Sequence, residues 1–433
     1  MSPRKRVMVS FQFVHAADLH LDTPFVGIGQ AASEALRETL RDASLDAWDA
    51  LVDLVIERDA AFLVLAGDIY DGAVRGVRAQ LRFLRGLERL AARQIPVFII
   101  HGNHDPLDGW SAIGDRWPPG VTVFGGTDVD AVPVVRDGVQ LATVYGISYG
   151  TRDVAENLSL RYRRGTGPGV HVGLLHCNVG ADAEHGSYSP CSLQDLLDRR
   201  LDYWALGHIH KRQTLSEGRT WVVYPGNTQG RSPKPSETGA KGAVVVDVAG
   251  GDVTGAAFVP LDRVRFGAVT IDVGGVTDLG TLRNELTARA EALRSEHEGR
   301  GLLLRATLTG RGPLYAALVR PGVIDELLHA LRDEAGLGEP VLWWDKLSID
   351  VRPDIDRAAV RRRDDFAAAL LGLADELRSD ADRLDHFTRE VAEAPVKLKA
   401  GRAAPPLDPN DLAKLLQDAE DVVLDLIEDG GGA

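Results

Sequence analysis

The sequence predicts an α/β fold in its first half, followed by a small α+β module and a helical C-terminal segment. The first observation is that short apolar runs, typical of buried strands, alternate with stretches whose apolar residues recur at helical spacing. The second is a change of character after Pro260, where two longer strand-like runs flank one amphipathic stretch. The third is that only helical periodicity remains beyond Pro353. Strand, helix and strand in succession favour a sheet whose two faces are covered by helices.

The first predicted strands occupy residues 11–17, 62–66 and 96–100, and a polar motif follows each of them. A helix with Ser44 as its expected N-cap is predicted between the first two strands by apolar residues at helical spacing, namely Leu45, Trp48, Val52, Val55 and Ile56. A second helix follows the second strand and carries leucines at positions 81, 84, 87 and 90. Further strands are expected at residues 121–124, 141–145, 170–175, 203–206, 221–224 and 243–248.

The second half is expected to hold strands at 264–273 and 301–308, a helix at 282–293 between them, and a strand pair at 342–344 and 347–351. The following segment has apolar residues near heptad spacing, namely Phe366, Leu370, Leu373, Leu377, Leu384, Phe387 and Val391. The last stretch has another apolar face, made of Leu412, Leu415, Leu416, Val423, Leu426 and Ile427. We therefore predict three parts, which span residues 1–262, 263–355 and 356–433.

Composition limits the class of protein. The chain has 433 residues, of which 44% are hydrophobic, so two or three domains with sizeable cores are expected at roughly 150 residues per domain. There are 63 acidic and 49 basic side chains, and the net charge of −14 excludes a generally basic nucleic-acid coat but leaves a local basic groove open. Only two cysteines, Cys177 and Cys191, argue against a disulfide framework. Since no apolar run is long enough to span a membrane, we expect a cytoplasmic protein without a membrane partner.

Polar motifs at the ends of five predicted strands carry the chemical signal. They are Asp18-Leu19-His20, Gly67-Asp68-Ile69-Tyr70-Asp71, Gly102-Asn103-His104-Asp105, the single His176, and Gly207-His208-Ile209-His210. In an open α/β sheet the loops at the carboxyl ends of the strands converge on one crevice. Carboxylate, imidazole and amide donors together suit divalent ions such as manganese, iron or zinc. A lone histidine at a strand end is more often structural than a ligand, but five such motifs in succession favour a metal site.

Three stretches make the motifs more specific: His15-Ala16-Ala17-Asp18-Leu19-His20-Leu21-Asp22, Trp204-Ala205-Leu206-Gly207-His208-Ile209-His210, and Pro225-Gly226-Asn227-Thr228-Gln229-Gly230-Arg231. With the other motifs, over about residues 11–260, they resemble the calcineurin-like metallophosphoesterase superfamily, and within it the bacterial DNA-repair exonucleases of the SbcD and YhaO type. The resemblance implies a metallophosphoesterase β-sandwich flanked by helices. It also implies that the α+β module is a small capping domain.

The resemblance further implies two divalent metal ions, with manganese as the first choice and iron, zinc or magnesium as alternatives. One ion would be held by Asp18, His20 and His210, and the other by Asn103, His176 and His208. Asp68 would bridge the two ions. His104 would be the catalytic histidine that is not a ligand, and Asp71 would accept a hydrogen bond from it and fix its orientation.

Basic residues outside this set have two interpretations each. Arg231, Lys234 and Lys241 are candidates for substrate contact because their loop follows the last ligand motif, although an exposed basic loop explains them almost as well. A stripe of arginines at helical spacing is either a phosphate-contacting surface or, as we favour, a solvated helix face, and consists of Arg78, Arg82, Arg85, Arg89 and Arg93.

The function predicted from these residues and the resemblance is hydrolysis of phosphodiester bonds by attack of a metal-bound hydroxide, in a DNA exonuclease or endonuclease of DNA repair. The alternatives are a phosphatase or cyclic-nucleotide phosphodiesterase on the same scaffold, and a non-catalytic scaffold that only binds metal. By analogy with SbcD-type nucleases, the C-terminal helices would dock an SMC-like coiled-coil ATPase; the plainer interpretation is that they pack on their own chain. A homodimer is left open.

Overall fold

The computed structural model describes residues 9–23, 25, 34–72, 76–109, 117–180, 188–297, 299–335, 340–352, 354–380, 383, 386, 416–417, 419–424 and 426–427. The chain forms two compact units. The first comprises Met1–Ala268, Arg289–Arg305 and Arg332–Lys346, and the second comprises Val269–Ala288, Ala306–Leu331 and Leu347–Ala433.

The first unit contains two six-stranded sheets. In the first sheet the order is β12 (Asp252–Pro260), β11 (Gly242–Ala249), β1 (Phe11–Ala16), β2 (Leu63–Ala66), β3 (Val97–Ile100) and β4 (Val121–Val123). Strands β1 to β4 run parallel to one another, whereas β11 is antiparallel to β1. The parallel pairs place the carboxyl ends of β1, β2 and β3 at the same edge.

The second sheet has the order β5 (Asp130–Arg136), β6 (Val139–Gly146), β7 (Val170–His176), β8 (Tyr203–Gly207), β10 (Trp221–Tyr224) and β9 (Gln213–Ser216). Its central strands β6, β7, β8 and β10 are parallel, and the edge strands β5 and β9 are antiparallel to their neighbours. The apolar runs that predicted strands correspond to these central strands. The predicted α/β class is therefore confirmed.

The two sheets pack face to face. Their shared core contains Phe13 and Phe98 from the first sheet, and Val172 and Tyr203 from the second. The ring of Phe13 stacks on Phe62 at 4.6 Å and meets Tyr203 edge-on at 5.3 Å. Because strands β1–β3 and β7–β8 are buried on both faces, they are nearly continuous apolar runs in the sequence.

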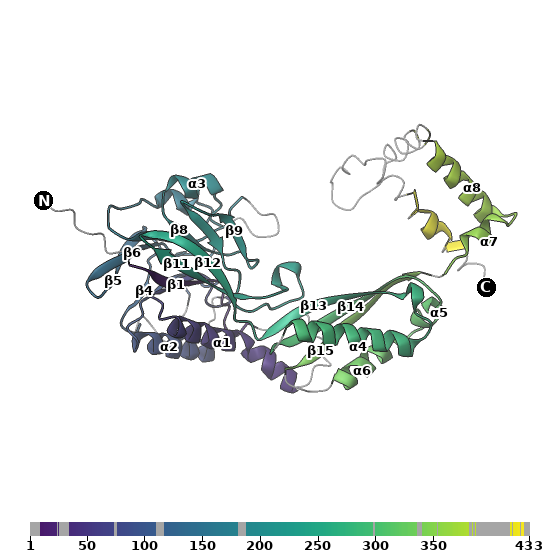
Figure 1. Cartoon of the computed structure of the whole chain (residues 1–433), viewed down its shortest axis with the longest axis horizontal. Coiled ribbons are helices and arrows are strands. Elements are labelled where there is room, and N and C mark those ends of the chain that lie inside the picture. The colour runs from purple at the N-terminus through teal and green to yellow at the C-terminus, as the bar shows by residue number, and fades with distance from the viewer. Residues whose placement is uncertain are drawn as a thin grey trace. The chain divides into compact units, whose positions relative to one another are not determined.

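Helices cover the outer faces. Helices α1 (Glu34–Glu57) and α2 (Val77–Ala91) lie side by side over the first sheet, with Trp48 and Phe83 buried beneath them (Figure 1). The short helix α3 (Leu193–Asp198) and the 3₁₀ turn η1 (Leu158–Arg161) contribute to the core on the outer face of the second sheet. The result is a helix-flanked β-sandwich.

The start of α1 differs from the prediction. Ser44 lies inside the helix rather than at its N-cap, and its hydroxyl accepts a hydrogen bond from the backbone nitrogen of Asp22 at 3.0 Å. The helix extends further toward the N-terminus because Leu36, Leu40 and Ala43 continue its apolar face, packing on Val264 and Trp343. These contacts are distant in the sequence, so local spacing did not indicate them.

The arginine stripe on α2 pairs with acids on α1. Arg82 contacts Asp46 at 2.6 Å and Asp49 at 2.7 Å, and Arg89 contacts Asp53 at 2.5 Å. Such exposed pairs contribute little to stability, about 0–1 kcal/mol each. They give these guanidinium groups partners within the fold, as expected of a solvated helix face rather than a phosphate-contacting surface.

The α+β module contains a three-stranded sheet in the order β13 (Val264–Asp272), β14 (Gly301–Arg311) and β15 (Leu342–Arg352). Its helices are α4 (Leu279–Glu296), α5 (Tyr315–Leu318) and α6 (Val323–Ala335). The predicted strand pair at 342–344 and 347–351 is instead the single strand β15. The polar residue in its middle, Asp345, does not break the strand because its carboxylate pairs with Arg305 at 2.6 Å.

The C-terminal segment is helical where it is described. Helices α7 (Arg357–Arg361) and α8 (Phe366–Ser379) are capped by Asp356 and Asp365. Leu371 of α8 packs with Leu424, a residue outside the predicted apolar face of the last stretch. Of that predicted face, Ile427 packs partly against this cluster, whereas Leu426 is 70% exposed, so the last stretch contacts its own chain mainly through a different face. The predicted apolar positions Leu384, Phe387, Val391, Leu412 and Leu415 lie outside the described residues. Among the described helices, none combines the length and the apolar character needed to cross a bilayer.

Candidate metal centre

The strand ends of both sheets bring the predicted ligands together. Asp18 and His20 follow β1, Asp68 follows β2, and Asn103 follows β3, while the second sheet contributes His176 at the end of β7. His208 and His210 follow β8. Possible ligand atoms lie within 4.8 Å of one another inside each of two groups. One group is Asp18, His20 and His210, and the other is Asp18, Asp68 and His176. His20 and His210, which are 190 positions apart in the sequence, therefore meet at one place.

Asp68 lies between the two histidine clusters. Its Oδ2 is 3.3 Å from Nε2 of His176 and 3.8 Å from Nε2 of His20. Its other oxygen, Oδ1, accepts a hydrogen bond from the backbone nitrogen of His104 at 2.9 Å. One carboxylate oxygen thus faces an imidazole of each cluster, which is the arrangement that a bridging ligand requires.

The first cluster consists of Asp18, His20 and His210. The Nε2 atoms of His20 and His210 lie 3.1 Å apart, although two neutral imidazoles gain at most one hydrogen bond from such an approach. Nδ1 of His20 is buried and has no hydrogen-bond partner among the described residues. Both oxygens of Asp18 accept from the backbone nitrogen of His208, at 3.0 and 3.1 Å. The donor set and the convergence of the two Nε2 atoms fit a divalent cation.

The second cluster consists of Asn103, His176 and His208. Nε2 of His176 is 3.0 Å from Oδ1 of Asn103, and its Nδ1 donates to the carbonyl of Ala66 at 3.0 Å. That second bond selects the tautomer whose Nε2 carries the lone pair, as in metal-ligating histidines whose other nitrogen is held by a backbone carbonyl. The ring of His208 lies 5.2 Å from that of His176.

The backbone at these positions is unusual. Asp18, His20, Asp68 and His208 all have positive φ, at 52°, 43°, 52° and 103°. Such strain persists where the surrounding structure requires it, and it clusters at functional sites. Three of the motifs begin with a glycine, and each glycine lacks room for a side chain. A Cβ would lie 2.5 Å from Nδ1 of His176 at Gly67, 2.3 Å from Oδ1 of Asp68 at Gly102, and 1.9 Å from the Ala66 carbonyl at Gly207.

Burial makes the charged forms of these side chains costly. Desolvation raises the pKa of Asp18. Burial acts most strongly on Asp68 and would raise its pKa, but the neighbouring imidazoles, His176 first among them, together lower it. Burial also acts most strongly on His176 and would lower its pKa, but the charge and hydrogen bond of Asp68 and the weaker contributions of other neighbours together raise it to about 9. Positive charge is thus favoured beside the buried Asp68, and divalent cations would supply it.

His104 and Asp71 form a pair beside the clusters. Nδ1 of His104 is 2.6 Å from Oδ1 of Asp71, and the two side chains are 34% and 28% exposed, whereas that of His20 is fully buried. Burial acts to lower the pKa of His104, but the hydrogen bond to Asp71 and the charges of Asp68 and Asp71 together raise it. The contact with Asp71 is made by Nδ1 and leaves Nε2 of His104 outside this pair. His20, Asp71 and His104 also form a third group of possible ligand atoms within 4.8 Å.

Glu237 is a neighbour of the site that was not predicted from the sequence. It lies in the 3₁₀ turn η2 (Pro235–Glu237), is buried, and has Oε1 at 2.6 Å from Nδ1 of His210. Burial acts to raise the pKa of Glu237, but its hydrogen bonds to His210 and Arg231 and the charges of these two residues together lower it to about 2. A glutamate in a polar loop carries no local pattern that would reveal this contact.

The basic candidates for substrate contact have partners within the fold. Nη1 of Arg231 contacts Oδ2 of Asp71 at 2.9 Å. Nζ of Lys241 donates to the carbonyl of His210 at 2.8 Å and to that of Ser236, and burial lowers its pKa to about 8. Lys234 is exposed at the start of η2. Substrate contact by these residues stays a prediction.

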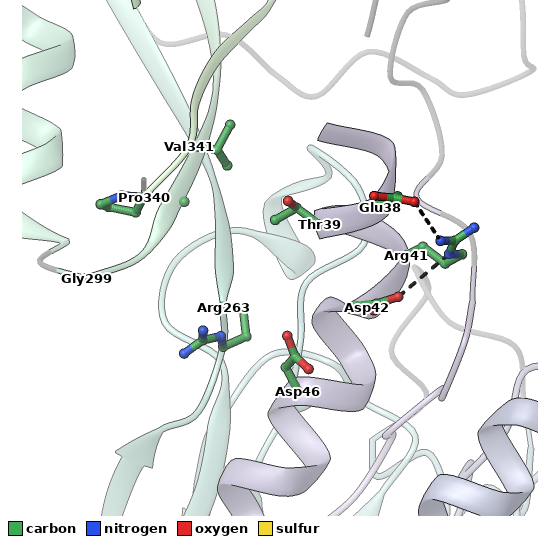
Figure 2. A pocket seen from close by; sticks show the side chains of 10 residues that line it. Glu38, Thr39, Arg41, Asp42, Asp46, Arg263, Gly299, Pro340 and Val341 are labelled. Atoms are coloured by element: carbon green, nitrogen blue, oxygen red, sulfur yellow. Dashed lines mark ion pairs between the residues drawn. The ribbon is translucent and has the colours of Figure 1, made fainter. Parts of the chain in front are cut away.

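A separate hollow of about 680 Å³ lies along α1 (Figure 2). Glu38, Asp42 and Asp46 line one side, and Arg263 and Val341 are among the residues that line the rest. Arg41 lies 3.7 Å from both Glu38 and Asp42. The hollow shares no residue with the metal centre.

Comparison with known proteins agrees with this geometry. Residues 11–212 match the calcineurin-like phosphoesterase family, and residues 266–352 match the middle domain of metallophosphoesterase YhaO. The chain is 35% identical over 338 residues to a Bacillus subtilis protein described as uncharacterized metallophosphoesterase YhaO, covering 78% of this chain and 81% of that one. The chain therefore belongs to the calcineurin-like metallophosphoesterases.

More distant relatives carry names of nucleases and repair proteins. The chain is 26% identical to the DNA double-strand break repair protein Mre11 of Thermoplasma acidophilum, over 59% of this chain and 69% of that one. It is 24% identical to a subunit of the nuclease SbcCD from Bacillus subtilis, over 56% of this chain and 67% of that one.

Proposed function

We propose that this metallophosphoesterase hydrolyses phosphodiester bonds in DNA, with two divalent metal ions and His104 as its catalytic groups. The observation that carries the proposal is the position of Asp68, whose Oδ2 faces His176 at 3.3 Å and His20 at 3.8 Å. The accessible pair of His104 and Asp71 beside it adds an acid that a purely structural metal site would not need.

In this proposal Asp18, His20 and His210 would hold one ion, Asn103, His176 and His208 would hold the other, and Asp68 would be shared between them. When bound, the ions supply Lewis acidity and lower the pKa of an attacking water, and manganese is our first choice. His104 donates a proton to the leaving oxygen of the ester. Asp71 accepts from Nδ1 of His104 at 2.6 Å, so the proton to be transferred sits on Nε2.

DNA as the substrate is supported by the likeness to Mre11 and to the SbcCD nuclease. The net charge of −14 gives no general attraction to a polyanion, so metal cations would provide the local positive charge. We also propose the division into a nuclease part (1–262), a capping part (263–355) and a C-terminal segment (356–433), which the family matches at 11–212 and 266–352 support.

A single assay tests the substrate. With Mn²⁺ present, the protein is incubated in parallel with linear DNA, a cyclic nucleotide, bis(p-nitrophenyl) phosphate and p-nitrophenyl phosphate. We expect degradation of DNA and hydrolysis of the synthetic diester. Hydrolysis of the monoester or the cyclic nucleotide with DNA left intact would favour the phosphatase or cyclic-nucleotide alternative. Absence of any hydrolysis would favour a non-catalytic scaffold.

We further propose that the C-terminal segment binds an SMC-like coiled-coil ATPase. Helix α8 buries Ala367 and Leu371 against its own chain, yet Phe366 and Leu373 remain 70% and 53% exposed on another face. The description of one relative as part of the SbcCD nuclease supports a partner of this kind. The variant Phe366→Asp/Leu373→Asp should lose co-purification with the ATPase while keeping diester hydrolysis. Unchanged binding would exclude this face as the attachment.

A further inference from the structure

One loop connects the two functional parts of the site. It follows β10 and carries Arg231 and Glu237, which contact each other through the backbone nitrogen of Arg231 and Oε2 of Glu237 at 3.0 Å. Glu237 reaches His210, a proposed metal ligand, with Oε1 to Nδ1 at 2.6 Å. Arg231 reaches Asp71, the partner of His104, with Nη1 to Oδ2 at 2.9 Å. The contacts form a continuous chain from a metal ligand to the catalytic pair.

We propose that Glu237 and Arg231 are positioning residues, of which Glu237 aims His210 at the metal and Arg231 holds Asp71 against His104. The inference rests on the proposed roles of His210 and His104. It assigns Arg231 a task other than contact with the substrate.

The case for Glu237 rests on burial and on the use of both its oxygens. Its side chain is 7% exposed, and Oε2 accepts from Nδ2 of Asn227 at 2.8 Å as well as from the nitrogen of Arg231. These two bonds fix the carboxylate, so Oε1 is held where Nδ1 of His210 meets it. A proton on that Nδ1 leaves Nε2 as the metal-binding nitrogen, and it is Nε2 that lies 3.1 Å from Nε2 of His20.

The case for Arg231 rests on the division of the Asp71 carboxylate. Oδ1 of Asp71 lies 2.6 Å from Nδ1 of His104, and Oδ2 accepts a hydrogen bond from Nη1 of Arg231 at 2.9 Å. With both oxygens engaged, the carboxylate cannot rotate away from His104 without losing a charged partner. The guanidinium side chain is 14% exposed, less than half the exposure of the 34% exposed His104. It is therefore less accessible to a substrate than His104 is.

The test for Glu237 measures metal binding, independently of turnover. Metal-free protein is titrated with Mn²⁺ by calorimetry, and the fold is checked by circular dichroism. Glu237→Ala should weaken one Mn²⁺ site by about 10- to 100-fold. Glu237→Gln keeps the hydrogen-bond acceptor but removes its charge, so its Mn²⁺ affinity should fall between that of the wild type and that of Glu237→Ala. If the alanine variant does not fold, the glutamine variant alone provides the test. Glu217→Gln, at an exposed turn, is the matched control. Wild-type affinity in folded Glu237 variants would overturn this half of the proposal.

The test for Arg231 is a double-mutant cycle with Asp71 on bis(p-nitrophenyl) phosphate. Arg231→Met should lower kcat by about 10- to 100-fold with KM and Mn²⁺ affinity unchanged, and Arg231→Lys should restore part of the loss. The double variant Arg231→Met/Asp71→Asn should be no slower than the slower single variant, since both changes break one unit. Arg219→Met, at an exposed turn, is the control.

The positioning role would be refuted if Arg231→Met raised KM and if the losses of the two single variants multiplied in the double variant. That result would make Arg231 a substrate contact. Failure of the proposed function has a different signature. If the wild-type protein hydrolyses neither diester nor monoester, the catalytic assignment fails, whereas the Mn²⁺ titration of the Glu237 variants still reports on its own part.

Discussion

Among single residues, the contrast between buried ligands and an accessible histidine is the most informative. Asp18, His20, Asp68 and His176 are almost completely buried, whereas the His104 side chain is 34% exposed. Buried ionisable groups are costly unless they are paired or coordinate a metal. The accessible histidine, oriented by Asp71, is free to meet a substrate. Under the proposed function, metal binding and proton transfer belong to different side chains, so substitutions should separate them.

His104→Ala should abolish most of the turnover and leave the metals in place. General acid catalysis contributes roughly 10²- to 10⁴-fold, so kcat should fall by about that factor. Metal content, measured by mass spectrometry of the purified variant, should equal that of the wild type. Normal activity in this variant would remove His104 from the catalytic role.

Asp68→Ala should lose metal as well as activity, because its Oδ2 is the oxygen that faces both His20 and His176. We expect fewer than two Mn²⁺ ions per chain by calorimetry and no measurable diester hydrolysis. Asp53→Ala, an exposed acid on α1 paired with Arg89, is a control that should keep both. Two bound ions in Asp68→Ala would show that the bridge is not needed.

At the scale of elements, the strand ends form the site, and close packing between them leaves no room for side chains. Gly102 follows β3, and a Cβ there would approach Oδ1 of Asp68 to 2.3 Å and Cε1 of His176 to 2.7 Å. Those two residues come from β2 and β7, so this one position controls the spacing of three strand ends.

Gly102→Ala should therefore displace Asp68 or His176 and weaken Mn²⁺ binding by at least about 10-fold, the lower end of the loss typical of changes around metal ligands. Gly125→Ala is the matched control, since no described atom lies within 4 Å of a Cβ at that position. Titration of both variants with Mn²⁺ compares them directly. Equal affinities would mean that the strand ends can adjust without loss.

The elements also show where reading the sequence succeeded. Strands β1, β2, β3, β7 and β8 were predicted because each is buried on both faces and is therefore a short apolar run. The start of α1 and the continuity of β15 were predicted wrongly. In both cases a contact distant in the sequence decided the outcome: Leu36 and Leu40 pack on Val264 and Trp343, and Asp345 pairs with Arg305.

For the molecule as a whole, the two sheets are joined by their apolar core and, at one edge, by a polar cluster with several buried carboxylates. Metal ions that bind only the folded chain would stabilise this edge in proportion to the logarithm of their concentration.

Removal of metal should accordingly lower the melting temperature. At 100 times the dissociation constant, Mn²⁺ would add about 2.7 kcal/mol per site, which is about 2–4 °C or more for a protein of this size. We expect Tm, followed by differential scanning fluorimetry, to fall with EDTA and recover with excess Mn²⁺. The Asp68→Ala variant should respond less than the wild type. An identical response in both proteins would mean that the ion acts elsewhere.

The sequence alone determined the kind of sheet and the identity of the candidate ligands, because buried strands are readable as apolar runs and their polar ends as interruptions of those runs. Tertiary structure alone decided which of these side chains touch. Arg231 and Asp71 are 160 positions apart, and Glu237 is 27 positions from His210, with no periodicity linking either pair. Such contacts form because distant segments of the chain come together at the same edge of the sandwich. Local sequence patterns do not predict which segments meet there.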